Sequence, residues 1–599
     1  MNLKTLLRRD EPADEGLLEP RHEHCLSCGA DLDASRLYER YRVCHSCGFH
    51  FHLNARERLA TILDPGTFHE DDRGVTSIDP ISFQGRQSYR SRVINAQRRT
   101  GLAESALTGT GAIFGREVVI SVLDFAFLGG SIGIVAGERL ARAFEKAAAR
   151  RAPVVTVCST AGTRMQEGLL ALMQVPRVIA AAQKFAEAGL PHIAVLTDPT
   201  TGSGYAGFVS LADVLIAEPN ALIGYAALGE LQENAPAELP PGAHTSESQL
   251  EHGLIDAVVP RPQLREALAQ LLDLLMNDYQ LSARDPQRDG RSAQPATGAW
   301  QQVQISRHEL RPGAADLIGR MVASFVELHG DRMGSDDPAI IAGIASLGGE
   351  AVMIVGQERR HKGPAPDGWI TAGGFRKAER AFKLAGKFGL PVITLIDCAG
   401  ALPAVENELA GLGRAIAGCM VTMLSTPSPT IAVITGEGSS EAAVAMAVAD
   451  RVLMLSNAVY EVVRPEDAAR ILYQQTGLAD QAAERLRLTS TDCLRLGIID
   501  GVVPEPGEGA HTDHDEAAAL VRRGVLRELT GLNALRPKTR MQRRYERYRE
   551  IGSTRSRIRG TAERRIAHLA DRVGGTWERV VRRNWRRRSD FDDDAHIAV

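Results

Sequence analysis

The chain has 599 residues, with 70 Lys and Arg against 74 Asp and Glu, which gives a net charge of -4 at pH 7. This length suggests several domains that each bury a core, and the small net charge excludes a strong overall bias toward nucleic acid or an anionic membrane. No apolar run is long enough to span a bilayer, and the amino terminus lacks the apolar stretch of a signal peptide, so we expect a cytoplasmic protein without a membrane partner.

Four of the eight cysteines lie near the amino terminus in two CxxC pairs, Cys25 and Cys28, then Cys44 and Cys47. Four thiolates at this spacing are typical of a closed structural zinc site, with no open position for a substrate. Free thiols or a redox pair are the alternative, although one redox motif would not explain the second pair. We therefore predict a zinc ribbon over residues 21–52 that holds one structural Zn²⁺ per chain.

Beyond the ribbon, apolar β-rich runs alternate with Ala-rich helical runs up to about residue 275. Strands are expected at 118–130 and 152–160, and helices at 137–151 and through RMQEGLLALM at 164–173. The order is βαβα, which is typical of an α/β domain with a parallel sheet.

The rest of the chain divides by composition. A polar segment rich in Asp, Gly, Pro and Ser follows the first α/β block and predicts an interdomain linker. A second α/β block comes next, and then a basic segment of helical composition, which is either a solvated helix with paired charges or a surface for RNA or an acidic partner. The predicted boundaries are a flexible N-terminus at 1–20, the ribbon at 21–52, α/β domains at 53–275 and 316–534, the linker at 276–315, and the tail at 535–599.

The second block repeats the first. APVVTVCST at 152–160 is similar to LPVITLIDC at 390–398, and the interval from Pro153 to Pro191 equals that from Pro391 to Pro429. GLIDAVVP at Gly253 and GIIDGVVP at Gly497 then close the two blocks. We infer an internal duplication of one α/β domain.

In each block, apolar strands end in small-residue turns that open helices. These turns lie at 159–163 and 201–204 in the first block, and at 398–400 and 436–440 in the second. Backbone N–H groups at such turns can stabilise a negative oxygen, as in an oxyanion hole. Ordinary turns of a layered α/β fold would have the same composition, so this pattern alone leaves both interpretations open.

The motifs together resemble a known family. The ribbon, FAFLGGSIG at 125–133, RMQEG at 164–168, LTDPTTG at 196–202 and AEPNALIG at 217–224 are similar, in order, to the β subunit of bacterial acetyl-CoA carboxylase carboxyltransferase.

The second block resembles the α subunit of the same enzyme, through ELHGDR at 327–332, FRKAERAFKLA at 375–385, GLPVITLID at 389–397, GEG at 436–438 and IIDGVVPEP at 498–506. The resemblance implies a fusion of β and α subunits and two crotonase-like α/β domains.

The resemblance also implies an activity. The enzyme would transfer a carboxyl group from carboxybiotin, held on a biotin carboxyl carrier protein, to acetyl-CoA, and so form malonyl-CoA for fatty acid or polyketide synthesis. A biotin carboxylase would be a further partner, and homo-oligomers would form by face-to-face packing of the two domain types. The β-like half would hold the CoA thioester and the α-like half the biotin, each with an oxyanion hole for the charge that develops in the reaction.

By position in this resemblance, the backbone groups of the acyl-CoA side are those of Ala161, Gly162 and Thr163, and those of the biotin side are Ser440, Glu441 and Ala442. The candidate residues for binding CoA or biotin are Gly129, Gly130, Arg164, Gly202, Gly436 and Gly438.

The sequence departs from the family pattern at several of these positions. A Gly-Gly pair is usual where Ala161-Gly162 and Glu441-Ala442 stand, and a carboxylate at Glu441 would oppose a forming anion unless it points away or is protonated. The run Arg359, Arg360, His361 and Lys362 replaces part of a Gly-His-Gln-Lys-Gly motif, and is either a solvated loop or a contact for phosphate or carboxylate groups.

These departures leave three alternatives to acetyl-CoA carboxylation. One is a longer or branched acyl-CoA acceptor. Another is a non-catalytic carboxyltransferase-like scaffold. The third is RNA binding through the ribbon and the basic tail, which would weaken steeply with salt.

Overall fold

The computed structural model describes residues 22–551, except residues 34, 78, 86, 227, 235–237, 283–297 and 364. The predicted flexible N-terminus and the tail beyond residue 551 lie outside this part. Among the described helices, none combines the length and the apolar character that a membrane span requires.

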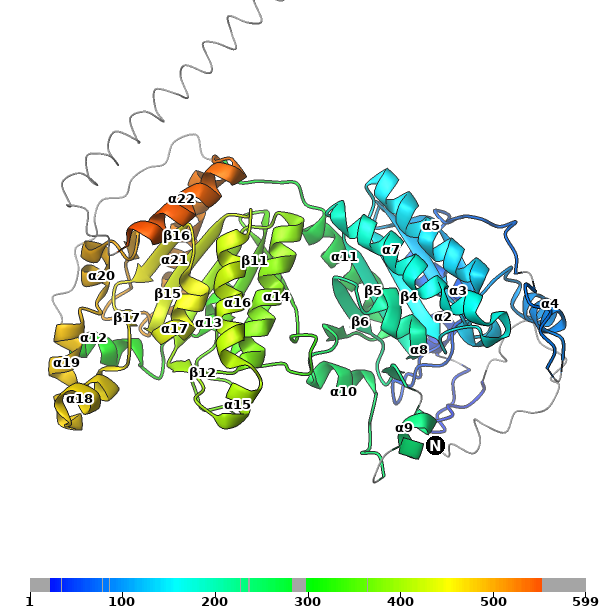
Figure 1. The fold of residues 1–599 in the computed structure, drawn as a ribbon, viewed down its shortest axis with the longest axis horizontal. Helices are drawn as coiled ribbons and strands as arrows, with labels where there is room; N and C mark the ends of the chain where they lie inside the picture. Colours follow the sequence, from blue (N-terminus) through cyan, green and yellow to red (C-terminus); the bar gives the residue numbers. More distant parts are fainter. Residues whose placement is uncertain are drawn as a thin grey trace, which may run out of the picture. The chain divides into compact units, whose positions relative to one another are not determined.

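The first half contains an eight-stranded mixed sheet (Figure 1). Its strand order is β1-β2-β3-β4-β5-β6-β8, with β7 pairing with β5; the first two pairings are antiparallel and the others parallel. The strands are β1 (His69–Glu70), β2 (Ala106–Ile113), β3 (Arg116–Leu123), β4 (Val154–Thr160), β5 (His192–Thr201), β6 (Val214–Ala217), β7 (Ile223–Gly224) and β8 (Ala257–Val258).

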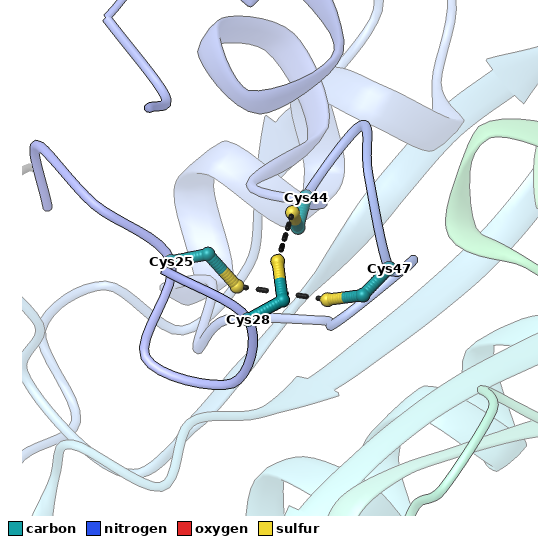
Figure 2. A group of neighbouring side chains, drawn as sticks. All are labelled: Cys25, Cys28, Cys44 and Cys47. Atoms are coloured by element: carbon teal, nitrogen blue, oxygen red, sulfur yellow. Dashed lines mark hydrogen bonds between the residues drawn. The ribbon is translucent and has the colours of Figure 1, made fainter. Parts of the chain in front are cut away.

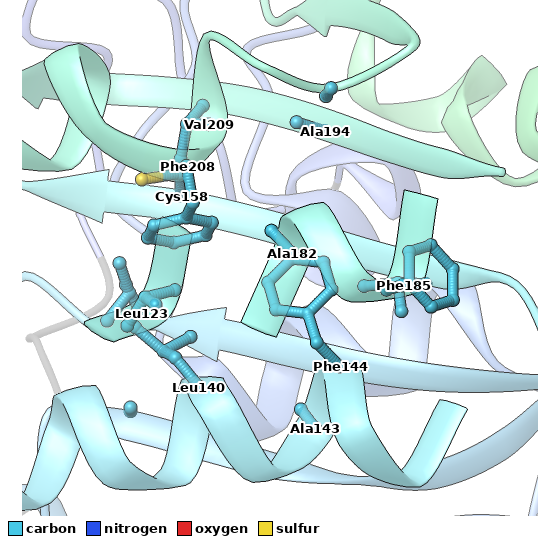
Figure 3. Packing of buried hydrophobic residues seen from close by; sticks show 14 of the residues in the cluster. Leu123, Leu140, Ala143, Phe144, Cys158, Ala182, Phe185, Ala194, Phe208 and Val209 are labelled. Atoms are coloured by element: carbon cyan, nitrogen blue, oxygen red, sulfur yellow. The ribbon is translucent and has the colours of Figure 1, made fainter. Parts of the chain in front are cut away.

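Helices α5 and α7 lie side by side across this sheet (Figure 1). The helices of this half are α2 (Arg36–Tyr41), α3 (Ala55–Ile62), α4 (Tyr89–Thr100), α5 (Ile134–Arg150), α6 (Leu169–Leu172), α7 (Gln174–Glu187), α8 (Gly202–Gly204), α9 (Leu228–Asn234), α10 (Ser246–Glu251) and α11 (Leu264–Leu275). Figure 3 shows the hydrophobic core between the sheet and helices α5 and α7. The ring centroid of Phe144 lies 5.6 Å from that of Phe185 and 6.1 Å from that of Phe208. Such aromatic and aliphatic burial is the main stabilising contribution to a domain of this kind.

The second half repeats this topology. Its sheet has the order β18-β16-β15-β13-β11-β10-β9, with β17 pairing with β15. The strands are β9 (Ser324–Glu327), β10 (Ile340–Leu347), β11 (Glu350–Gln357), β13 (Val392–Cys398), β15 (Thr430–Ser439), β16 (Arg451–Leu455), β17 (Val459–Glu461) and β18 (Gly501–Val503); β12 (Trp369–Ile370) and β14 (Gly400–Ala401) form a separate pair.

The helices of the second half cover its sheet in the same way, with α14 beside α16 (Figure 1). They are α12 (Ala299–Ser306), α13 (Ala314–Met321), α14 (Ala372–Phe388), α15 (Val405–Leu409), α16 (Leu412–Ser425), α17 (Ser440–Ala447), α18 (Pro465–Tyr473), α19 (Ala479–Leu486), α20 (Ser490–Leu496), α21 (His514–Asn533) and α22 (Pro537–Glu550).

The duplication extends to a local irregularity in strand pairing. The register between β4 and β5 shifts between Cys158 and Thr160, and the register between β13 and β15 shifts between Ile396 and Cys398. These are the same positions in the alignment of the two repeats, so the predicted duplication of an α/β domain is confirmed.

Three local expectations are wrong. The strand expected at 118–130 ends at Leu123, and Leu128–Gly130 form a 3-10 turn instead. The segment 164–173 is not one helix, because Gly168 adopts φ 61° and ψ −142° and separates a 3-10 turn at Met165–Glu167 from α6. That conformation is open to glycine and strained for other residues. In addition, the segment expected to be linker contains α12, whose residue Val303 is buried.

The first part of the basic tail is not simply solvated. Arg540 and Arg544 of α22 are buried, and Arg544 Nε donates to Asp450 Oδ1 at 2.9 Å. Arg544 also donates to backbone carbonyls that include Ser428 O at 2.9 Å. These arginines therefore stabilise the second domain, because a buried guanidinium needs an acidic partner and several acceptors.

Polar contacts join the two sheet domains. Arg380 Nη2 lies 2.8 Å from Asp256 Oδ1, and Lys387 Nζ lies 2.7 Å from Asp213 Oδ1. The N–H of Arg332 donates to Gly253 O at 3.0 Å. The halves thus have a specific mutual interface within one chain.

Candidate functional site

The four amino-terminal cysteines converge, as Figure 2 shows. Their Sγ atoms lie within 4.8 Å of one another, with Cys25–Cys47 at 3.6 Å and Cys28–Cys44 at 3.7 Å. A tetrahedral Zn²⁺ with bonds of about 2.3 Å requires sulfur–sulfur separations of about 3.8 Å, so this arrangement fits the ion. The CxxC turns close on glycines with positive φ, Gly29 and Gly48, which bring each pair of thiols to one side.

A buried ion pair network fixes the ribbon to the first sheet domain. Arg261 pairs with Glu218 at 2.7 Å and donates through Nη1 to two carbonyls of the ribbon, Tyr41 O at the end of α2 and Phe51 O. Arg58 of α3 pairs with the same carboxylate at 2.5 Å. The two guanidinium groups hold the pKa of Glu218 well below its usual range, despite the opposing effect of its burial.

The predicted acyl-CoA turn forms part of a compact arrangement of small residues. The N–H of Ala161 donates to Gly129 O at 2.9 Å, and Thr160 Oγ1 donates to Gly130 O at 2.7 Å. A side chain on Gly130 would lie 2.0 Å from Ser159 O, so only glycine fits there. The loop after β3 and the turn after β4 are therefore in direct contact.

The turn after β5 packs against the same place. Thr163 Oγ1 lies 2.6 Å from Ser203 Oγ, and a Cβ on Gly202 would lie 2.9 Å from Ala161 O. The structure thus brings Ala161–Thr163 together with Gly129, Gly130 and Gly202, at the carboxyl ends of neighbouring parallel strands. This edge of an α/β sheet is where such folds usually bind ligands.

Two of the three predicted donors on this side are already used within the protein. The N–H of Ala161 bonds to Gly129 O, and the N–H of Gly162 bonds to Thr160 Oγ1 at 3.0 Å. Ala161 is not among the residues with positive φ, so its replacement of glycine causes no backbone strain.

The two predicted sets of donors are not equivalent in the repeat. Ala161–Thr163 follow the second parallel strand of their sheet, β4, whereas Ser440–Ala442 follow the third, β15. The residues equivalent to Ser440–Ala442 are Gly202, Ser203 and Gly204, which begin α8 directly after β5. Gly202 is among the residues predicted from the sequence to bind CoA or biotin, whereas Ser203 and Gly204 are not. The equal Pro–Pro intervals of the two repeats are the signal that aligns these two residues with Glu441 and Ala442.

The two turns after the third strand share an unusual backbone. Gly202 has φ 63° and Ser440 has φ 56°, and each starts a helix whose first N–H groups lack intrahelical acceptors. Ser440 is a rare non-glycine residue in this left-handed conformation. Glu441 is exposed to solvent, and Ala442 is buried, with its carbonyl accepting from Gln357 Nε2 at 3.1 Å.

Comparison with known proteins identifies the family. A model for acetyl co-enzyme A carboxylase carboxyltransferase-like proteins matches residues 280–552. The acetyl-coenzyme A carboxylase carboxyl transferase subunits beta/alpha of Salinispora tropica is 43% identical over 542 residues, which cover 88% of this chain and 96% of that protein. The chain belongs to the fused beta/alpha acetyl-CoA carboxylase carboxyl transferases. Membership of this biotin-dependent carboxyltransferase family makes it a transferase.

Two further matches extend the comparison. A probable biotin-dependent acyl-coenzyme A carboxylase beta3 subunit of Mycobacterium bovis is 35% identical over 500 residues, covering 82% of this chain and 97% of that one. The solved structure of transcarboxylase 12S, a hexamer with methylmalonyl-coenzyme A and methylmalonic acid bound, has a TM-score of 0.66 and 21% identity, covering 81% of this chain and 90% of that chain. The latter likeness confirms the crotonase-like carboxyltransferase fold.

Arg164 is buried inside this carboxyltransferase, whereas a residue that binds CoA or biotin is expected to have exposed atoms. Its side chain is fully buried and pairs with Glu104, while Nη1 donates to Ser77 Oγ at 2.9 Å and Nη2 to Ser131 O at 2.7 Å. Glu167, from the same motif, accepts the N–H of Ile134 at the start of α5. In this conformation Arg164 supports the loop around Gly129 and Gly130 and has no exposed atom to offer a ligand.

The altered loop of the second domain is likewise tied to the protein. Arg359 Nε donates to Asp397 Oδ1 at 2.9 Å, and its Nη2 pairs with Glu437. Arg360 donates to the carbonyls of Glu309 and Arg311. A solvated position is therefore wrong for Arg359, because the buried carboxylates at the ends of β13 and β15 attract it. Arg360 remains exposed, and its guanidinium donates to these backbone carbonyls.

The glycines of the GEG motif leave room for neighbouring side chains, Gly436 for Asp397 of this ion pair network and Gly438 for Tyr460. A Cβ on Gly436 would lie 2.5 Å from the Asp397 carboxyl carbon, and one on Gly438 would lie 3.2 Å from the Tyr460 ring. Both glycines lie inside β15 and are buried. Their position beneath α17 indicates a packing role beside the predicted biotin-side turn.

Proposed function

We propose that this carboxyltransferase moves the carboxyl group of carboxybiotin, presented by a biotin carboxyl carrier protein, to acetyl-CoA and so forms malonyl-CoA. A separate biotin carboxylase would recharge the carrier. The observation that carries the proposal is the matched pair of left-handed residues, Gly202 and Ser440, each of which opens a helix at the same strand of the two repeats. The close identity to fused beta/alpha relatives named for acetyl-CoA supports this substrate.

The chemistry proposed for the chain is electrostatic. In the first domain, backbone N–H groups of Thr163 and of Ser203 and Gly204 would stabilise the thioester enolate. In the second domain, those of Glu441 and Ala442 would stabilise the ureido oxygen of biotin. An α-proton of a thioester is too weakly acidic to leave without such stabilisation, and the biotin released in the reaction can accept it.

The proposed role of zinc is structural. The four cysteines described above would hold one Zn²⁺ in a closed tetrahedron, and the ion would fold the ribbon without contacting the substrates. The contacts of Arg261 would then hold the folded ribbon against the first sheet domain.

We call the turns Ala161–Thr163 and Gly202–Gly204 the acyl-CoA-side half-site, and Ser440–Ala442 the biotin-side half-site. We also propose that the chain forms homo-oligomers in which the acyl-CoA-side half-site of one copy faces the biotin-side half-site of another. Exposed apolar side chains lie on the segment that follows the second parallel strand of each sheet: Met165 and Leu169 after β4, and Val405 and Leu409 after β13. Clusters of exposed large apolar residues mark protein interaction surfaces. Transcarboxylase 12S, whose fold this chain shares, assembles as a hexamer.

The test is carboxyl exchange by the purified chain, with malonyl-CoA and free biotin or biotinylated carrier, followed as acetyl-CoA release. We expect turnover by the unmodified chain and at least equal turnover by Glu441→Gly, since an exposed carboxylate weakens, but need not abolish, stabilisation of a nearby anion. Activity only in the variant would indicate a biotin side disabled by Glu441. Inactivity of both would contradict the proposal and favour a scaffold.

A second candidate is a different acyl-CoA acceptor. The observation that favours it is the match to a probable biotin-dependent acyl-coenzyme A carboxylase subunit over most of both chains. Mass spectrometry of the products from a mixed pool of acyl-CoA thioesters distinguishes the two candidates, because each carboxylated product has its own mass.

A further inference from the structure

Glu461 is a buried acidic residue that has no role in the proposed reaction. It is the last residue of β17 and pairs in the sheet with Ser439, the residue that precedes Ser440 and the start of α17. Its side chain is only 5% exposed, and neither carboxyl oxygen receives a hydrogen bond from a described residue. A buried carboxylate without donors is strongly unfavourable, so this group needs a physical explanation.

The charges around Glu461 come from several elements. Glu437 of β15 is beside it, and Arg307, which follows α12, has its Nη2 3.9 Å from Glu461 Oε1. Glu466 of α18 is partly exposed and pairs with the same Arg307. Arg359, on the loop after β11, bridges Glu437 to Asp397 of β13.

The two arginines of this cluster are already paired with other carboxylates. Arg307 Nε donates to Glu437 Oε1 at 3.0 Å, and Arg359 pairs with Glu437 and Asp397. Two guanidinium groups therefore balance two buried carboxylates, and an ionised Glu461 would add a third negative charge without compensation. A protonated Glu461 adds no charge and gains one O–H donor, for which Glu437 is the adjacent acceptor.

We propose that Glu461 is a positioning residue of the biotin-side half-site, which holds a proton toward Glu437 and so keeps Arg307 and Arg359 bridged across Glu437 beneath α17. This role rests on the proposed function of the α17 turn. Burial and the neighbouring Glu437 carboxylate raise the pKa of Glu461 to about 9, in agreement with the geometry. Loss of the proton would place a negative charge next to the donors that stabilise the developing anion.

The first experiment measures kcat/KM for biotin in malonyl-CoA decarboxylation by the full chain between pH 7 and 9.5. If only the protonated form of Glu461 is competent, the unmodified chain should be about fourfold less active at pH 9.5 than at its plateau. Glu461→Gln, which is always neutral and keeps a donor, should lose this decline. The control is Glu466→Gln. Glu466 also pairs with Arg307, but the Glu466 side chain is 40% exposed, so this variant should retain the decline.

A second measurement does not depend on activity. A carboxyl whose pKa is raised on folding binds more protons in the folded than in the unfolded state, so the stability of the unmodified chain should fall as the pH rises from about 4.5 toward 9. Glu461→Gln lacks this loss, so its urea midpoint should increase relative to that of the unmodified chain over the same range. Equal midpoints throughout would overturn the bound proton.

The outcomes separate the two proposals. An alkaline decline that persists in Glu461→Gln, or is absent from the unmodified chain, would overturn the positioning role. An unmodified chain without exchange at any pH would overturn the proposed function, while the urea midpoints would still decide whether Glu461 holds a proton.

Discussion

Ser440 shows how a single backbone angle can determine local stability in this molecule. Its φ of 56° is the conformation that glycine occupies without strain, and glycine is found at the equivalent position of the first repeat, Gly202. A side chain in this region costs about 1 kcal/mol or more, a cost that the surrounding strand and helix must offset.

We predict that Ser440→Gly raises the stability of the second domain by up to about 1 kcal/mol, because the relief of this strain is partly offset by the entropy that glycine adds to the unfolded chain. Ser439→Gly is the matched control: Ser439 has φ −108°, so glycine there relieves nothing and should be neutral or destabilising. Urea unfolding followed by tryptophan fluorescence measures the effect, since all four tryptophans lie at residue 300 or later. A lower midpoint for Ser440→Gly than for Ser439→Gly would contradict the argument.

At this scale the sequence predicted some residues and not others, for physical reasons. The four cysteines are informative because two short turns supply all the thiols, so local spacing is enough to bring them together. The partners of Arg359 and Glu461 come from separate strands, β13, β15 and β17, and become neighbours only once the sheet forms. No spacing rule relates Glu461 to Ser439, 22 positions away, without the strand pairing.

Among the elements, the zinc ribbon depends most on a few contacts. Its hydrophobic cluster is small, consisting mainly of Leu32, Tyr38 and Phe51 with the buried thiols Cys25 and Cys44. So small a core cannot stabilise a fold by itself, and a metal is the usual supplement.

We predict that Cys28→Ser reduces bound zinc from one per chain to near zero and unfolds the ribbon, with the second domain unchanged. Cys158→Ala, which removes a buried thiol of β4 outside the cluster, should retain the metal. Elemental mass spectrometry gives the zinc content, and the tryptophan-monitored urea midpoint reports on the second domain. Full zinc occupancy in Cys28→Ser would contradict a four-thiolate site.

The elements themselves were largely predictable. Alternating apolar and Ala-rich runs predicted β3, α5, β4 and their counterparts, because hydrophobic periodicity reflects one buried face. The segment 164–173 was misjudged because its apolar residues fit a helix, while Gly168 interrupts it. The sequence did not predict that the first part of the tail is buried, because Arg540 and Arg544 donate to acceptors on residues far away in the sequence.

For the whole molecule, the exposed apolar residues after β4 and β13 lead to a prediction about assembly. Leu169 is 69% exposed in α6 and Leu409 is 85% exposed in α15, and these helices occupy the same place in the two repeats. If they meet in an oligomer, each would become buried against another copy.

We predict that Leu169→Asp or Leu409→Asp lowers the molar mass measured by light scattering, because a charge in an apolar contact is costly to desolvate. Leu310→Asp is the control, since Leu310 is 64% exposed but lies outside both helices. An unchanged mass in both variants, or an equal decrease in the control, would show that these helices are not the contact.

The ion pairs Asp256–Arg380 and Asp213–Lys387 join domains that belong to one polypeptide. Tethering converts their association from a bimolecular to an intramolecular step, in which an effective concentration set by the chain replaces the bulk concentration. The pairing of the two halves therefore does not weaken as the protein is diluted. A cell that synthesises this chain also obtains both halves in equal number, without matching the expression of two messages.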